Sequence, residues 1–226
     1  MEKALNPLLW VRLPLLKRLR YFAIIYLLKV NLRVRRSFAN SLSCLVACPS
    51  QVVHEPSLKV YPCRPKLTHR IYFPETYQPG ECLPLYINIH GGGFAFSTPE
   101  QDEEFCVFFS NRFKLTVISI SYSLTPWATL PVPTQDVAAI VPAILSDFTL
   151  PIDHSRVAIG GFSEGGNLAL SACQLPPLQG KIKAAIPWYA PVDWSVDLAY
   201  KLSTRPYKRA SDIDGLANMA TIFTDM

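Results

Sequence analysis

Residues 157–170 read Val-Ala-Ile-Gly-Gly-Phe-Ser-Glu-Gly-Gly-Asn-Leu-Ala-Leu, and this stretch decides the fold. An apolar strand, a Gly-x-Ser-x-Gly turn and an apolar helix follow one another without a gap. Such a turn forces strained backbone at Ser163, and the flanking Gly161 and Gly165 remove side chains that would collide. The hydroxyl of Ser163 then stands above the sheet, where the helix directs its N-terminal N–H groups toward forming charge. The stretch predicts a nucleophile elbow with Ser163 as the nucleophile.

A second glycine-rich turn follows an apolar strand in the run Leu-Tyr-Ile-Asn-Ile-His-Gly-Gly-Gly-Phe, at residues 85–94. Three glycines let backbone amides approach a substrate oxygen closely, as an oxyanion hole requires. We expect the amides of Gly91, Gly92 and Glu164 to donate to that oxygen, and His90 to brace the loop. A phosphate cradle is the alternative use of such a run, but no P-loop lysine follows and the spacing is not that of a dinucleotide fingerprint.

Strand-type and helical patterns alternate from residue 57 onward. The strand-type runs are at 58–61, 70–73, 83–90, 115–121, 156–160 and 183–189, and the helical stretches are at 133–148 and 164–174. Strands that are apolar on both faces and alternate with helices imply a mostly parallel sheet with helices on both faces. We predict an α/β domain over residues 46–226, preceded by a helical extension over residues 1–45.

With both motifs in place, the chain resembles the hormone-sensitive-lipase-like family of serine esterases, which has the α/β-hydrolase fold. His90 precedes Ser163 by 73 positions, and Ser-Tyr-Ser-Leu-Thr-Pro at 121–126, with Asp136 downstream, is similar to the family's Tyr-Arg-Leu-Ala-Pro segment and its following aspartate. The resemblance covers residues 57–195. It implies hydrolysis of small or medium apolar carboxylic esters through an acyl-enzyme, without cofactor or metal.

Three residues depart from the family's pattern. Phe162 and Glu164 stand where aspartate and alanine are common, and Ser123 replaces the usual arginine. A carboxylate beside the oxyanion hole disfavours developing negative charge unless it points away or is paired. Reduced activity is therefore one expectation.

Aromatic side chains near the two motifs are candidates for an apolar acyl pocket. These are Phe94, Phe96 and Trp127. Aromatic residues at such positions are more often part of the core.

The remainder of a catalytic triad is not evident. The family order is serine, acid, histidine, yet the four histidines are His54, His69, His90 and His154. None follows Ser163. Since His154 enters the strand that leads to Ser163, we expect it at the opposite end of the sheet.

The acidic residue of the triad is also not identified by the sequence. Asp193 is a fallback candidate, although a turn cap after Pro191 is the better interpretation.

We expect the chain to be C-terminally truncated and to lack the last strands of the fold. The alternative function is that of a catalytically impaired or inactive hydrolase-like protein that binds a ligand or partner.

The net charge of +5 conceals an asymmetry, because the first forty residues carry nine lysines and arginines against one glutamate. The extension is thus strongly basic and the remainder slightly acidic, so the main domain offers no electrostatic support for nucleic-acid binding. Six cysteines are scattered without a CxxC pair, which predicts neither a zinc site nor a disulfide framework.

An apolar stripe runs through the extension at steps of three and four, which predicts an amphipathic helix. The stripe comprises Leu16, Leu19, Ala23, Tyr26, Leu27, Val30 and Val34. The apolar run 21–28 is short of the roughly 20 residues that cross a bilayer, and the arginines after it disfavour a secretory signal. We expect cytoplasmic residence. Residues 12–36 suit peripheral contact with an anionic membrane and equally a cap over the hydrolase core.

Overall fold

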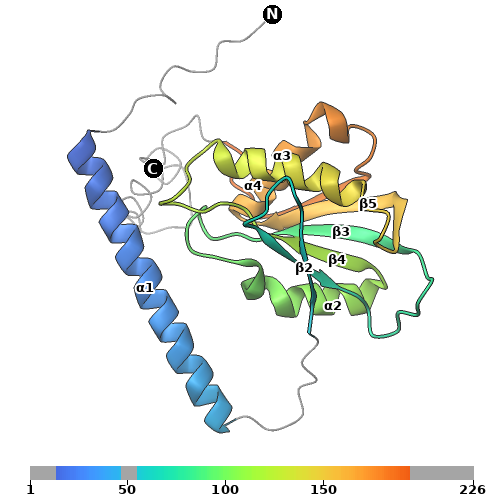
Figure 1. Cartoon of the computed structure of the whole chain (residues 1–226), viewed down its shortest axis with the longest axis horizontal. Coiled ribbons are helices and arrows are strands. Elements are labelled where there is room, and N and C mark those ends of the chain that lie inside the picture. Colours follow the sequence, from blue (N-terminus) through green and yellow to red (C-terminus); the bar gives the residue numbers. More distant parts are fainter. Residues whose placement is uncertain (1–13, 47–54, 194–226) are drawn as a thin grey trace, which may run out of the picture. The chain divides into compact units, whose positions relative to one another are not determined.

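The computed structural model describes residues 14–46 and 55–193 (Figure 1). Helix α1 (Leu15–Val46) belongs to one compact unit, and residues 55–193 belong to another. The second unit contains β1 (Ser57–Val60), β2 (Thr68–Tyr72), β3 (Leu83–Ile89), the 3-10 turn η2 (Pro99–Asp102), α2 (Glu103–Phe113), β4 (Thr116–Ile120), α3 (Val132–Leu145), β5 (Ile152–Phe162), α4 (Glu164–Cys173), the 3-10 turn η3 (Pro176–Leu178) and β6 (Ala184–Trp188).

The strands of the described residues form one six-stranded sheet in the order β1-β2-β4-β3-β5-β6. The pairs β4–β3, β3–β5 and β5–β6 are parallel, whereas β1–β2 and β2–β4 are antiparallel. The predicted α/β fold with a mostly parallel sheet is confirmed.

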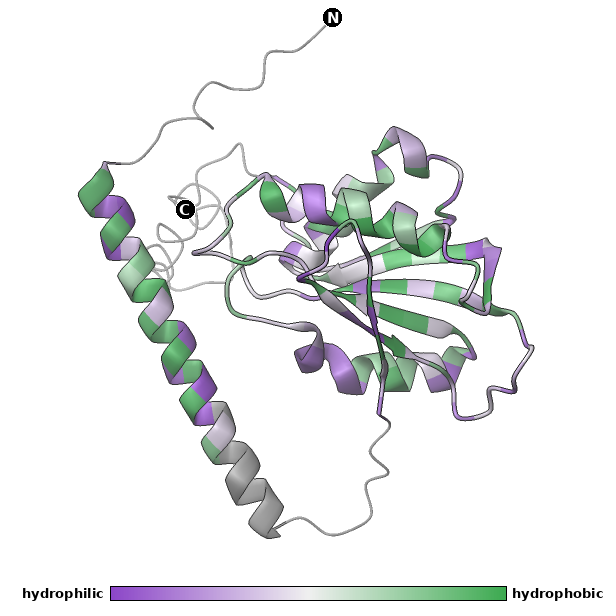
Figure 2. Cartoon of the chain, in the orientation of Figure 1, coloured by the Kyte–Doolittle hydropathy of each residue, from purple (hydrophilic) through white to green (hydrophobic). Residues whose placement is uncertain are grey.

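Helices cover both faces of this sheet, with α3 and α4 on one side and α2 on the other (Figure 1). The central strand β3 shows the consequence for side chains. Leu85, Ile87 and Ile89 are buried in a cluster with apolar residues of α3 and α4. Tyr86, which points to the opposite face, is buried with Cys106 of α2. A strand buried on both faces is apolar at every position, which is why β3 and its neighbours are hydrophobic along much of their length (Figure 2).

Helix α1 is the predicted N-terminal helix, and hydrophobic and hydrophilic residues are interspersed along it (Figure 2). Within the described residues, no helix combines the length and the apolar character that crossing a bilayer requires.

Candidate active site

Ser163 is the single residue between β5 and α4. Its backbone has φ 52° and ψ −120°, a left-handed conformation that is costly for a side chain other than glycine. Its N–H donates to the carbonyl oxygen of Trp188 at 2.9 Å, and its own carbonyl oxygen accepts from the N–H of Asn167 at 3.2 Å. These bonds hold the strained turn between β6 and the first turn of α4, in the geometry predicted for a nucleophile elbow.

The two glycines that flank the serine make close packing possible. A Cβ atom at Gly161 would lie 2.1 Å from the carbonyl oxygen of Ile89, and one at Gly165 would lie 2.0 Å from the same atom. No side chain fits at such distances. The elbow therefore packs directly on the carboxyl end of β3.

The glycine loop begins at that same strand end. β3 and β5 are parallel neighbours, and Ile89 pairs with Gly161. A Cβ atom at Gly91 would lie 2.7 Å from the carbonyl oxygen of Phe162 and 3.4 Å from the Cβ of Ser163. The two motifs, far apart in the sequence, thus meet at the carboxyl ends of adjacent strands, where open α/β sheets place their sites.

The third glycine of the loop makes a contact that the sequence did not reveal. The N–H of Gly93 donates to Oε2 of Glu164 at 2.7 Å. Donation to a substrate oxygen by the amides of Gly91 and Gly92 remains a prediction. Gly93 has φ 61°, and its place as the last glycine of the run is the only sequence signal that could have indicated it.

His90 lies beneath the loop. Its ring is 1% exposed and stacks on Tyr122, with ring centroids 4.3 Å apart and planes 13° apart. Its Nδ1 lies 2.9 Å from the carbonyl oxygen of Gly91, and the Tyr122 hydroxyl donates to the carbonyl oxygen of His90 at 3.0 Å. Burial lowers the pKa of His90 to about 4, so the ring is neutral at neutral pH and Nδ1 carries the proton. His90 is placed to support the loop.

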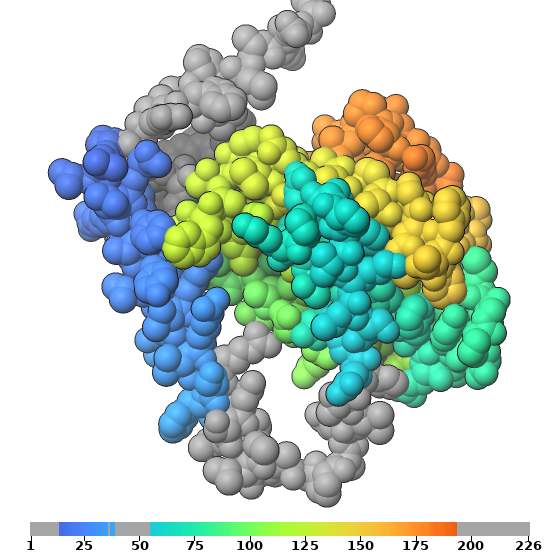
Figure 3. Space-filling model, viewed as in Figure 1, coloured from blue at the N-terminus to red at the C-terminus, as the bar shows by residue number. Residues whose placement is uncertain are grey.

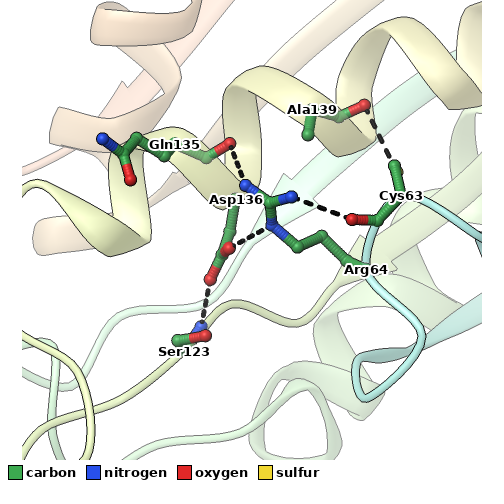
Figure 4. Close-up of polar contacts among 6 residues, drawn as sticks. All are labelled: Cys63, Arg64, Ser123, Gln135, Asp136 and Ala139. Atoms are coloured by element: carbon green, nitrogen blue, oxygen red, sulfur yellow. Dashed lines mark hydrogen bonds and ion pairs between the residues drawn. The ribbon is translucent and has the colours of Figure 1, made fainter.

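An ion pair between a buried carboxylate and a partly exposed arginine holds the segment after β4 (Figure 4). Asp136 on α3 is 2% exposed. Its carboxylate accepts the Ser123 N–H at 2.8 Å and forms an ion pair with Nε of Arg64. Arg64 also donates to the carbonyl oxygens of Cys63 and Gln135, at 2.8 and 3.2 Å. In the space-filling view, the segment of β1 and β2 (cyan) lies beside α3 (yellow-green) on one face (Figure 3). Tyr122 is held in place through its neighbour Ser123.

Two further candidates from the sequence are His154 and Asp193. His154 is at the start of β5 with its ring 5.8 Å from that of Phe148, whereas Ser163 follows the end of this strand. Nine residues of strand correspond to about 30 Å, so His154 is at the opposite end of the sheet, as expected. Asp193 is exposed in the stretch after β6.

Two of the three aromatic candidates for the acyl pocket have clear environments. Phe94 is partly buried and packs on the main core cluster, whereas Trp127 is 75% exposed. Phe96 has intermediate exposure. In residues 14–46 and 55–193, no group of His, Cys, Asp and Glu is arranged to hold a metal ion.

A strained serine between a parallel strand and a helix, beside a glycine loop at the next strand, is the arrangement that defines the α/β-hydrolase class. The chain belongs to the family described as alpha/beta hydrolase fold, which matches residues 86–223. The resemblance to hormone-sensitive-lipase-like esterases is confirmed by its relatives.

Three curated relatives illustrate this. The carboxylic ester hydrolase LipN of Mycobacterium tuberculosis is 36% identical over 110 residues, which cover 44% of this chain and 27% of LipN. The arylesterase of Saccharolobus solfataricus is 34% identical over 100 residues, 44% of this chain and 32% of that protein. Hormone-sensitive lipase of Mus musculus is 29% identical over 99 residues, 43% of this chain and 13% of the lipase. The chain thus spans a third or less of the length of these relatives.

Solved structures of esterases have the same fold. The ester hydrolase EH1AB1 from the metagenome of Lake Arreo, solved with a bipyridine phosphonate derivative, is 26% identical with a TM-score of 0.59, covering 85% of this chain and 64% of that one. An esterase of Pyrobaculum calidifontis is 25% identical with a TM-score of 0.55, covering 78% and 59%.

Proposed function

We propose that this chain carries the nucleophile and the oxyanion loop of a serine carboxylesterase. The observation that carries the proposal is the strained Ser163 at the end of β5, packed directly against the glycine loop that follows β3. Relatives named as carboxylic ester hydrolase and arylesterase are 36% and 34% identical to 44% of this chain, which supports ester hydrolysis over other chemistry.

The proposed reaction proceeds through an acyl-enzyme. The Oγ of Ser163 attacks the carbonyl carbon of a small or medium apolar ester, and the carbonyl oxygen becomes an oxyanion. The amides of Gly91, Gly92 and Glu164, to which we add that of Gly93, donate to this oxygen. The alcohol leaves with a proton, and water then cleaves the acyl-enzyme and restores the Ser163 hydroxyl.

The base that takes the Ser163 proton is not one of the three described histidines. His90 lies beneath the loop, and His154 lies at the other end of the sheet. His69 is fully buried, and its Nδ1 accepts the Ser121 N–H at 3.1 Å. Without a paired base, oxyanion binding alone retains roughly 10³- to 10⁴-fold catalysis over water.

The test is hydrolysis of p-nitrophenyl acetate and butyrate by the chain beside its Ser163→Ala variant, together with fluorophosphonate labelling. We expect slow hydrolysis that the variant loses, and labelling at Ser163. Equal rates for the two proteins and no labelling would refute catalysis by this chain.

We propose secondly that the α1 segment contacts anionic membrane surfaces. The observation that favours this is the exposure of its apolar side chains, such as Leu16 and Leu27, on a helix that also carries Arg33 and Arg35. Basic amphipathic helices bind by inserting the apolar side and pairing the cations with anionic lipid.

Co-sedimentation of the full chain with phosphatidylserine vesicles checks this second proposal. We expect binding that 0.5 M salt weakens, that an Arg33→Gln, Arg35→Gln variant reduces, and that phosphatidylcholine vesicles do not show. Equal binding to both kinds of vesicle would exclude the electrostatic contact.

A further inference from the structure

The carboxylate of Glu164 reaches from the start of α4 to the glycine loop. Its Oε2 accepts the N–H of Gly93 at 2.7 Å, across 71 positions of sequence. A carboxylate that accepts a backbone N–H at this distance makes a charge-assisted hydrogen bond, which is stronger than a neutral one. The loop amide is therefore already bound to an anion that the protein itself supplies.

We propose that Glu164 is an internal anion that occupies the Gly93 donor and competes with the substrate's carbonyl oxygen for the oxyanion loop. The inference rests on the proposed function, because it concerns the same loop and the same nucleophile. The substrate class it concerns is any ester or oxyanion analogue whose oxygen must reach the loop beside Ser163.

The surroundings keep the carboxylate in this position. Glu164 is the first residue of α4, where the positive end of the helix dipole stabilises a negative charge. Burial raises the pKa of Tyr122, and the nearby charge of Glu164 raises it further. The carboxylate thus lies close to both Gly93 and the Tyr122 that supports the loop.

Two consequences follow for an incoming ester. Its oxygen must displace a charged acceptor from Gly93, and the oxyanion that forms then lies near a carboxylate, which repels it. The side chain of Glu164 therefore opposes catalysis, although its backbone N–H remains one of the proposed donors.

The experiment measures the second-order rate at which a fluorophosphonate labels Ser163. In this reaction a P–O bond forms to Oγ, the P–F bond breaks to release fluoride, and the hydroxyl proton passes to solvent. The proteins compared are the wild type, Glu164→Ala and Glu164→Gln. Ser163→Ala measures background labelling, and Glu104→Gln is a matched control on an exposed carboxylate of α2.

We expect Glu164→Ala to label about tenfold to a hundredfold faster than the wild type, as removal of one charge-assisted hydrogen bond predicts. Glu164→Gln should fall between the two, because its amide oxygen still accepts the Gly93 N–H but carries no charge. Glu104→Gln should label like the wild type.

Failure of this inference and failure of the proposed function give different results in the labelling experiment. A Glu164→Ala variant that labels no faster than the wild type, with an unchanged melting temperature, would show that the carboxylate supports the loop and would overturn the inference alone. No labelling in any variant, or equal labelling of Ser163→Ala, would remove the proposed function and the inference together.

The hydrogen bond itself has a readout that does not depend on reactivity. In ¹⁵N–¹H spectra, the amide proton of Gly93 should resonate far downfield in the wild type, move partly upfield in Glu164→Gln and move furthest in Glu164→Ala. Identical Gly93 shifts in the three proteins would also overturn the inference.

Discussion

Two buried histidines, His69 on β2 and His90 after β3, sit where a charge cannot be accommodated. They are 0% and 1% exposed, and burial lowers the pKa of each from 6.5 to about 4. Above pH 6.5 both are neutral whether the chain is folded or unfolded. Between pH 6.5 and 4 the unfolded chain binds protons that the folded chain excludes, so stability falls as the pH falls.

The pH dependence can be measured by urea unfolding at intervals from pH 7.5 to 4.5. Each histidine should contribute a loss on the order of 3 kcal/mol by pH 4, so the wild type should lose stability steeply below pH 6.5. His69→Gln should flatten the curve, because glutamine does not titrate. His154→Gln, at an exposed position of β5, is the matched control for the substitution itself. A slope that neither buried histidine influences would contradict this account.

At the scale of elements, the Arg64–Asp136 pair joins the turn after β1 to α3 and to the segment after β4. The Asp136 side chain is 3% exposed, whereas that of Arg64 is 34% exposed. Removing the arginine leaves a buried carboxylate that still accepts the Ser123 N–H but has lost its cationic partner. Loss of one member of a buried pair is far more costly than loss of a surface pair.

We expect Arg64→Ala to lower the free energy of unfolding by about 3 kcal/mol. Arg156→Ala removes an exposed pair with Asp153, in which the arginine side chain is 59% exposed, and should cost less than about 1 kcal/mol. Chemical denaturation of the two variants gives the comparison. Equal losses would mean that Arg64 does not compensate the buried charge.

Across the whole molecule, the structural features that depend on residues close together in the sequence were predictable from it. The elbow follows from the Gly-x-Ser-x-Gly turn between an apolar strand and helix, and the central strands follow from apolar runs buried on both faces. Helix α2 was not predicted, because its apolar residues are mixed with charged ones and are not confined to one face: Phe105 and Phe109 pack against the sheet, whereas Phe108 and Phe113 are exposed.

Contacts between side chains far apart in the sequence were not predictable. Residue spacing gives the face of a helix on which Glu164 lies, but not that its carboxylate turns toward Gly93. Likewise, nothing near Arg64 indicates a partner 72 positions later on α3. Strand β5 also begins earlier than expected, at Ile152, because pairing with Leu83 extends it through polar residues that do not form a strand pattern.

The position of β3 in the sheet affects folding during synthesis as well as the arrangement of the finished fold. β3 lies between β4 and β5, and both of its partners come later in the chain, with Gly161 pairing to Ile89. At about 5–20 residues per second, a ribosome needs several seconds to supply β5 after β3 has emerged. During that interval β3 lacks its β5 partner, and distant pairings of this kind form slowly. We therefore expect the yield of native protein to depend on translation rate and chaperone access between residues 90 and 162, as well as on the stability of the finished fold.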